Sequence, residues 1–196
     1  ARVSDYAFAE KSATLYFVTK GDSTGLEAGI YLLDPTKGTP SLVKAGDGLF
    51  RQVALDEQGN HLAFLYCAEK DSAYKALELW LSERGETAKA IAGRGNKALP
   101  TGWVINENGT LSFSRSAARL FFGTSPEPRQ KDTTILDTTR PNVQVWSWDE
   151  PVQYTVQQYN LKEDLKKNYR AVYNIQKGQV IQLADKSLPN IQLGDE

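Results

Sequence analysis

The chain has 196 residues, of which 40% are hydrophobic and 24% are charged, and its formal net charge is −1. This composition is typical of one ordinary globular domain, and the near-neutral charge does not favour nucleic-acid binding. Because the sequence has no run of about 18 apolar residues, we expect no membrane span.

Three copies of one repeat follow each other along the chain. Residues 8–19 align without a gap with residues 55–66 and again with residues 113–124. Each copy joins short apolar runs to turn sequences such as DEQGN and NENGT, a pattern that predicts strands. Four short strands in a unit of about 40 to 50 residues are typical of a β-propeller blade. We therefore predict an all-β fold with little helix, a partial β-propeller of about three four-stranded blades.

The repeat also predicts boundaries within a single partial propeller that spans 1–196. Blade-like repeats are expected at about 1–48, 49–96 and 97–186, and residues 187–196 look like the start of a further blade. The ungapped alignment continues beyond the common strand and places Ile30 and Leu32 on Leu77 and Leu79.

The third repeat is longer than the others in its second half. We expect residues 143–149, VQVWSWD, to form one of its strands, with Trp146 and Trp148 on a face buried between blades. The stretch 123–141 is rich in Pro, Thr and charge, which predicts an exposed excursion. The one expected helix spans 160–170 and begins at Asn160 as N-cap. Trp80 and Trp103 lie in comparable strands.

Residues 21–25, GDSTG, fit the G-x-S-x-G pattern of a serine hydrolase nucleophile. Ser23 and His61, the only histidine, form a candidate hydrolytic pair, which Asp34 or Asp56 could complete in chain order. The pattern needs a helix directly after the serine, whereas a β-type run follows here. We therefore interpret GDSTG as a hairpin loop and assign no catalytic residue, with a hydrolase built on Ser23 and His61 as the least favoured alternative.

Other short patterns also favour structural roles. GRGNKA, at 93–98, resembles a dinucleotide-binding loop but is not followed by a helical segment. His61 and Cys67 lie six residues apart on one strand without further soft ligands, so we expect no metal and no cofactor. Asn108-Gly109 is expected to form a tight turn rather than a glycosylation site.

Residues 102–158 and 169–185 carry a family resemblance. Their LSFS, RLFFGT, VWSWD, AVYN and IQLAD segments resemble, at matching spacing, the N-terminal β-propeller of bacterial serine peptidases of the prolyl oligopeptidase family. The resemblance covers about residues 50–185. It departs at Ser116-Ala117, where such blades usually carry Asp-Gly in the turn.

The resemblance implies a parent protein in which a C-terminal α/β-hydrolase domain carries the catalytic residues and acts on peptides. This chain would then be a non-catalytic propeller segment that caps the catalytic cavity and limits substrate access. The resemblance also implies a periplasmic or otherwise extracytoplasmic location. A propeller-type binding module for a protein or glycan partner is the alternative function.

The number of repeats predicts either self-association or marginal stability of the isolated chain. Propellers close with about four to eight blades, and closure protects the apolar faces of each sheet. Three blades fall short of that number, so we expect the terminal blades to expose apolar faces. The isolated chain should then either associate through these faces or be marginally stable.

Overall fold

The computed structural model describes residues 3–21, 25–69, 75–128, 143 and 145–194. The chain divides into two compact units. Unit 1 comprises Ala1–Pro126 with Asn168–Glu196, and unit 2 comprises Glu127–Lys167. The strands lie in unit 1 and the helix lies in unit 2.

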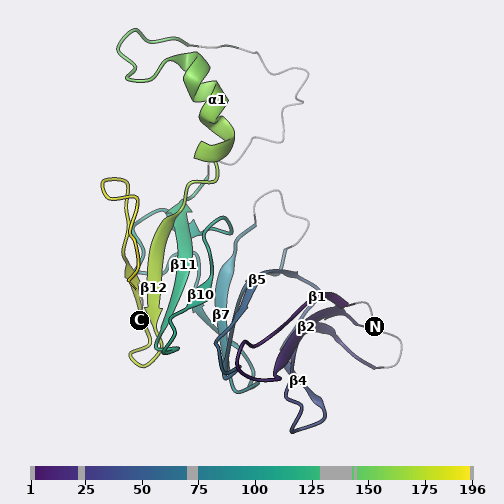
Figure 1. Cartoon of the computed structure of the whole chain (residues 1–196). Helices are drawn as coiled ribbons and strands as arrows, with labels where there is room; N and C mark the ends of the chain where they lie inside the picture. Colours follow the sequence, from purple (N-terminus) through teal and green to yellow (C-terminus); the bar gives the residue numbers. More distant parts are fainter. Residues whose placement is uncertain (1–2, 22–24, 70–74, 129–142, 144, 195–196) are drawn as a thin grey trace. The chain divides into compact units, whose positions relative to one another are not determined.

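Unit 1 consists of three antiparallel sheets that follow each other in chain order (Figure 1). The first sheet contains β1 (Val3–Phe8), β2 (Leu15–Lys20), β3 (Ala28–Leu33) and β4 (Pro40–Ala45). The second contains β5 (Leu49–Leu55), β6 (His61–Cys67), β7 (Glu78–Glu83) and β8 (Lys89–Ala92). The third contains β9 (Trp103–Ile105), β10 (Ser112–Phe113), β11 (Arg119–Pro126), β12 (Tyr169–Asn174) and β13 (Gln179–Gln182).

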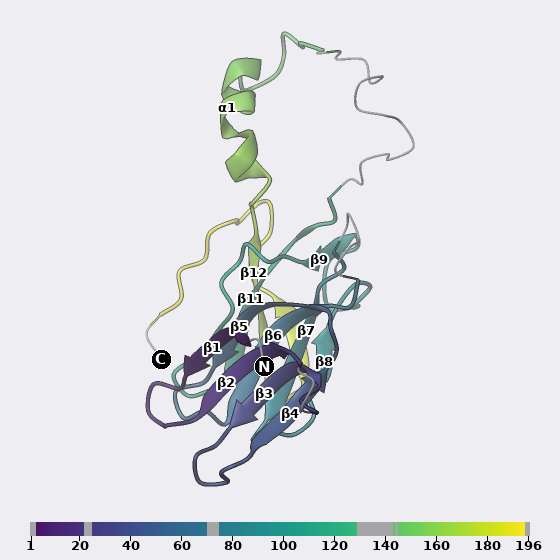
Figure 2. The same cartoon turned by 90° about the vertical axis from the view of Figure 1, so that its right-hand side faces the viewer.

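The first and second sheets are four-stranded meanders, the third has five strands, and the sheets stack face to face (Figures 1 and 2). In the third sheet β9 and β10 both pair with β11, so one strand position is shared by two short strands. The predicted all-β fold, a partial β-propeller of four-stranded blades with little helix, is confirmed.

The strand register repeats from sheet to sheet, as the sequence alignment predicts. The equivalent cross-strand pairs are Phe8 with Leu15, Leu55 with Leu62, and Phe113 with Leu120. Since directly opposite residues lie on the same face of a sheet, equivalent residues of the three repeats face the same way.

The alignment slips beyond this common strand pair. Tyr16 lies opposite Leu32, and its equivalent Ala63 lies opposite Leu81, so Leu32 corresponds to Leu81 and not to Leu79. The second hairpin is therefore two residues longer than the first. A shift of two residues leaves every side chain on its original face, which is why the apolar pattern did not reveal it.

The second sheet is buried on both faces, and β6 shows this most clearly. Alternate residues of a strand point to opposite faces. Toward the first sheet, β6 presents Leu62, Phe64 and Tyr66. Toward the third sheet it presents Ala63, Leu65 and Cys67. This double burial explains why HLAFLYC is apolar along nearly its whole length.

The strand expected at 143–149 is wrong. In the described part of this stretch the backbone is not a strand, and the Trp148 side chain is 96% exposed. Tyr169–Asn174 pairs with β11 in its place and buries Ala171 and Val172 on opposite faces. If VQVWSWD were a strand, Ser147 and Asp149 would lie on the face opposite to the two tryptophans. That face would then bury the Asp149 carboxylate between sheets, which is unfavourable.

The helix expected at 160–170 is displaced toward the N-terminus. Helix α1 spans Tyr154–Asp164 in unit 2, so Asn160 lies inside the helix and is not its N-cap. The N-cap is Gln153, which makes no capping hydrogen bond through its side chain, and the first turn has no acidic residue. The start of helix α1 therefore lacks both signals that predict a helix N-terminus, a capping side chain and acidic residues in the first turn.

The excursion expected at 123–141 begins later than predicted. Residues 123–126 belong to β11 and pair with β9 or β12. Residues 129–142 lie outside the described residues.

Candidate functional site

Asp56 and His61 form a hydrogen-bonded pair across the turn between β5 and β6. His61 Nδ1 lies 2.7 Å from Asp56 Oδ2, and the backbone N–H of Asn60 donates to Asp56 Oδ1 at 2.7 Å. Gly59 closes this turn with φ at 74°, a conformation that glycine adopts readily. The Asp56 side chain is only 3% exposed, so the turn holds a nearly buried carboxylate.

The pair contains two of the residues considered for a hydrolase, Asp56 and His61. The His61 ring packs against the Phe113 ring, with 6.0 Å between centroids. Asp34 instead accepts hydrogen bonds from the backbone N–H and hydroxyl of Thr36 in its own turn. Ser23 lies outside the described residues.

The hydrogen bonds to Asp56 determine its ionisation. Burial alone would raise the pKa of Asp56, but the hydrogen bonds from His61 and Asn60 hold this pKa below its ordinary value. The lowered pKa means that the charged carboxylate is stabilised by the folded turn. This contribution is fully present above the unfolded-state pKa, about 3.9, and is lost as pH falls through the lower folded-state pKa.

We expect Asp56→Asn to lower the free energy of unfolding at pH 7 by about 1.5–3 kcal/mol, because hydrogen bonds to a charged group are lost. Urea unfolding measured between pH 7 and pH 3 should show the difference from wild type shrinking below about pH 4. Glu86→Gln, at an exposed position in the connection between β7 and β8, is the matched control and should leave the pH profile unchanged. A constant difference between wild type and Asp56→Asn across this pH range would contradict this account.

A lysine of the first sheet lies over two aromatic rings of the second. Lys44 Nζ is 3.8 Å from the centroid of the Trp80 ring and 4.3 Å from that of Tyr66. The Trp80 indole N–H donates to Glu78 at 3.1 Å. Burial lowers the pKa of Lys44, and the Glu78 carboxylate opposes this shift. Lys44 therefore makes a cation–π contact with both rings, and this contact between the first and second sheets stabilises their packing.

A polar pocket of about 430 Å³ lies where the first and second sheets meet. Charged side chains of both signs line it, namely Asp5, Lys20, Asp47 and Arg51. The Tyr16 hydroxyl lies 3.4 Å from Asp5, and burial, with the Asp5 charge adding to it, raises the pKa of Tyr16 to about 12. Mixed charges of this kind suit a polar ligand with several hydrogen-bonding groups.

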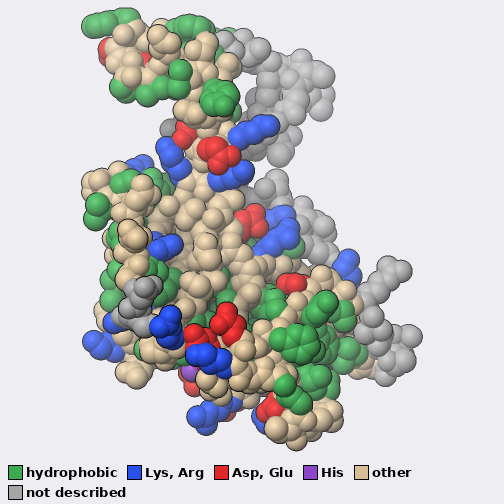
Figure 3. All heavy atoms as spheres, viewed as in Figure 1, with side chains coloured by type: hydrophobic (Ala, Val, Ile, Leu, Met, Phe, Trp, Pro, Cys, Tyr) green, Lys and Arg blue, Asp and Glu red, His purple; other side chains and the backbone are tan. Residues whose placement is uncertain are grey.

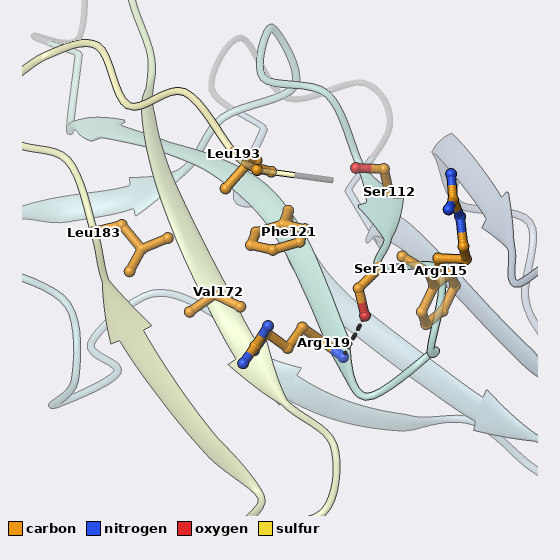
Figure 4. Close-up of a pocket in the computed structure, with 10 residues that line it drawn as sticks. Ser112, Ser114, Arg115, Arg119, Phe121, Val172, Leu183 and Leu193 are labelled. Carbon is orange, nitrogen blue, oxygen red and sulfur yellow. Dashed lines mark hydrogen bonds between the residues drawn. The ribbon is translucent and has the colours of Figure 1, made fainter. Parts of the chain in front are cut away.

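An apolar pocket of about 490 Å³ lies on the face of the third sheet that points away from the second (Figure 4). Its apolar lining is formed by Phe113, Phe121, Val172, Leu183 and Leu193. Polar side chains at its margin are Ser112, Ser114, Arg115 and Arg119. Figure 4 shows the hydrogen bond that the Arg119 backbone N–H donates to Ser114 Oγ, at 3.1 Å. The pocket is suited to apolar side chains.

Residues of three other predicted patterns lie in turns or strands. Residues 93–98 form a loop with turns after β8, and Asn108-Gly109 lies in a turn after β9. Cys67 is buried and reaches the carbonyl of Glu69 at 3.5 Å. Within the described ranges, no cluster of three or more histidine, cysteine or acidic side chains could hold a metal ion. No helix in the described part of the chain is long and apolar enough to cross a membrane.

No family model matches the chain, and no curated protein sequence matches it. Solved structures do resemble it. A prolyl endopeptidase is 13% identical with a TM-score of 0.49, and the match covers 97% of this chain and 22% of the endopeptidase chain. TolB from Acinetobacter baumannii is 12% identical with a TM-score of 0.45, and the match covers 94% of this chain and 33% of the TolB chain. An acylaminoacyl peptidase from Pyrococcus horikoshii is 15% identical with a TM-score of 0.46, and the match covers 92% of this chain and 24% of the peptidase chain. The chain spans a third or less of the length of these proteins.

Proposed function

We propose that this chain is a non-catalytic propeller segment of a prolyl oligopeptidase-like serine peptidase. In the parent protein it caps the catalytic cavity of a C-terminal α/β-hydrolase domain and limits the access of peptide substrates. The observation that carries the propeller part of this proposal is the unequal burial of equivalent phenylalanines. Phe64 in the second sheet is 0% exposed, whereas Phe17, at the same position of the first sheet, is only partly buried.

This inequality is what a segment of a larger ring should show. An inner blade is covered on both faces, and a terminal blade is covered on one. The peptidase part of the proposal is supported by the segments of the third repeat that resemble that family's propeller. The positions of Asp56 and His61 support a non-catalytic role, because both are engaged in holding a turn.

The polar pocket between the first and second sheets favours a second candidate function, a binding module for a protein or glycan partner. Its four charged side chains offer donors and acceptors to a polar ligand. This alternative needs no hydrolase domain elsewhere in the parent protein, so the two functions are separable by experiment.

We expect residues 1–196 alone to show no turnover of peptidyl nitroanilide or nitrophenyl ester substrates. The gene should continue downstream into a hydrolase domain, and the longer product should cleave the peptidyl substrate. A fluorophosphonate probe should label a serine of that longer product beyond Glu196. Ser23→Ala is the control and should change nothing. Labelling of Ser23 would refute the non-catalytic role, and a downstream product without a reactive serine would favour the binding module.

A further inference from the structure

The polar pocket between the first and second sheets lies where an edge strand of each sheet bulges. Strand β1 has a bulge between Val3 and Asp5, and β5 has one between Arg51 and Ala54. A bulge leaves one residue unpaired and re-aims the side chains around it. Asp5 and Arg51 both line the pocket, so the two bulges shape it from opposite sides.

Asp5 and Arg51 occupy equivalent positions in the two bulges. Asp5 lies opposite Val18, and Arg51 lies opposite Leu65, the residue that aligns with Val18 in the second repeat. This position therefore carries a negative charge in the first sheet and a positive charge in the second.

Between the second and third sheets, the bulge position forms an ion pair. Arg51 Nε lies 3.4 Å from the carboxylate of Glu107, in the turn after β9. The neighbouring Gln52 side chain donates a hydrogen bond to the Glu107 backbone carbonyl. Gln52 has a φ of 45°, which is uncommon for a residue other than glycine. The bulge of β5 thus directs two donor side chains to one acidic residue.

Between the first and second sheets, the described residues show no such ion pair. The hydrogen bond that they provide to Asp5 comes from the Tyr16 hydroxyl of its own sheet, at 3.4 Å. In front of Asp5 lies the pocket of about 430 Å³. Because a carboxylate stands here in place of the Arg51 guanidinium, the group complementary to it is a cation.

Other groups of the pocket fit a cation that is carried on an aliphatic stem. Asp47 adds a second carboxylate from the loop between β4 and β5. This loop lies directly on β6, since a Cβ on Gly48 would be 2.5 Å from the Cys67 carbonyl oxygen. Leu49 and Phe50 give the pocket apolar surface, which suits the stem of a long basic side chain.

The charge of the pocket also favours a cation over an anion. Arg51 is paired with Glu107, so the other charged side chains of the lining are Asp5, Asp47 and Lys20. Two carboxylates and one ammonium group give a net charge of −1. Figure 3 shows acidic and basic side chains interspersed over the sheets of unit 1. The local charge of the pocket, and not a strong field of the whole chain, therefore selects the ligand.

We propose that the polar pocket binds an ammonium or guanidinium group on an aliphatic stem, carried by a lysine or arginine side chain of a peptide or by a small free amine. Asp5 and Asp47 accept charge-assisted hydrogen bonds from this group, and Leu49 and Phe50 contact the stem. This inference rests on the second candidate function, whose ligand chemistry it names, and does not depend on the peptidase parent.

Calorimetric titration of the 196-residue chain with two matched peptides tests the proposal. Acetyl-Gly-Arg-Gly-amide and the same peptide with citrulline in place of arginine are similar in size, but only the first is charged. We expect the arginine peptide to bind about 10-fold more tightly or better. Agmatine is the third probe, a free ligand with a guanidinium group. Tighter binding of the peptide supports a peptide side chain as the source of the cation, and tighter binding of agmatine supports a free amine.

Three variants test the roles of the charges. Asp5→Asn should weaken binding of the arginine peptide by about 10-fold, because the amide cannot make a charge-assisted hydrogen bond to a cation. Lys20→Gln should strengthen it by about 3-fold, because a like charge is removed from the lining. Asp34→Asn is the matched control and should leave the affinity unchanged, since Asp34 lies in the turn between β3 and β4 and does not line the pocket.

Equal affinity for the arginine and citrulline peptides, or an unchanged affinity in Asp5→Asn, would overturn the inference. Cellotriose, a neutral glycan, separates this failure from failure of the second candidate function. Cellotriose binding that Asp5→Asn weakens, without a preference for the arginine peptide, would overturn the cation inference and keep the binding module. Absence of binding for all four probes would overturn both.

Discussion

Phe64→Ala is expected to lower the free energy of unfolding by about 3–5 kcal/mol. The Phe64 ring is fully buried in the core shared by the first and second sheets, and it packs against the Phe50 ring at 5.6 Å between centroids. Strands of both sheets hold the surrounding side chains in place, so the cavity cannot collapse. Since whole domains are stable by only about 5–15 kcal/mol, this one ring matters to the entire fold.

Phe17→Ala is the matched control for Phe64→Ala. Phe17 occupies the same position in the repeat and stacks on Tyr31 at 5.2 Å between centroids, but it is only partly buried. Its loss should cost about 1–2 kcal/mol. Urea unfolding followed by circular dichroism measures both variants. Equal losses would mean that the two faces are equally covered, contrary to the structure.

The sequence predicted the fold well where the repeat could be compared with itself. The pairing of Phe8 with Leu15 recurs in all three sheets, because the same apolar positions must face neighbouring blades. Prediction failed in the third repeat between β11 and β12, where unit 2 is inserted and neither earlier repeat offers a counterpart. There, the tryptophans of VQVWSWD suggested a strand, but strand formation depends on a partner and on what both faces would bury.

The candidate sites were less predictable than the fold. The sequence analysis did not predict the hydrogen bond between His61 and Asp56. A signal did exist, since Asp56 is the first residue of the DEQGN turn and His61 directly follows that turn. The apolar pocket of the third sheet had no such signal, because Leu193 comes from a segment without regular structure whose course depends on tertiary packing.

Gly109→Ala is expected to lower the melting temperature by about 6–12 °C, which corresponds to about 3 kcal/mol for a chain of this size. The turn that holds Gly109 crosses β11 directly over Gly123, and a Cβ on Gly109 would lie 2.9 Å from the Gly123 nitrogen and 2.7 Å from Asn168 Oδ1. The obstacle at Gly123 is backbone within a paired strand, so it cannot move aside without breaking the third sheet. Gly194→Ala, where an added Cβ meets nothing within 4 Å, is the matched control in calorimetry. A change below about 2 °C in Gly109→Ala would show that the turn does not press on β11.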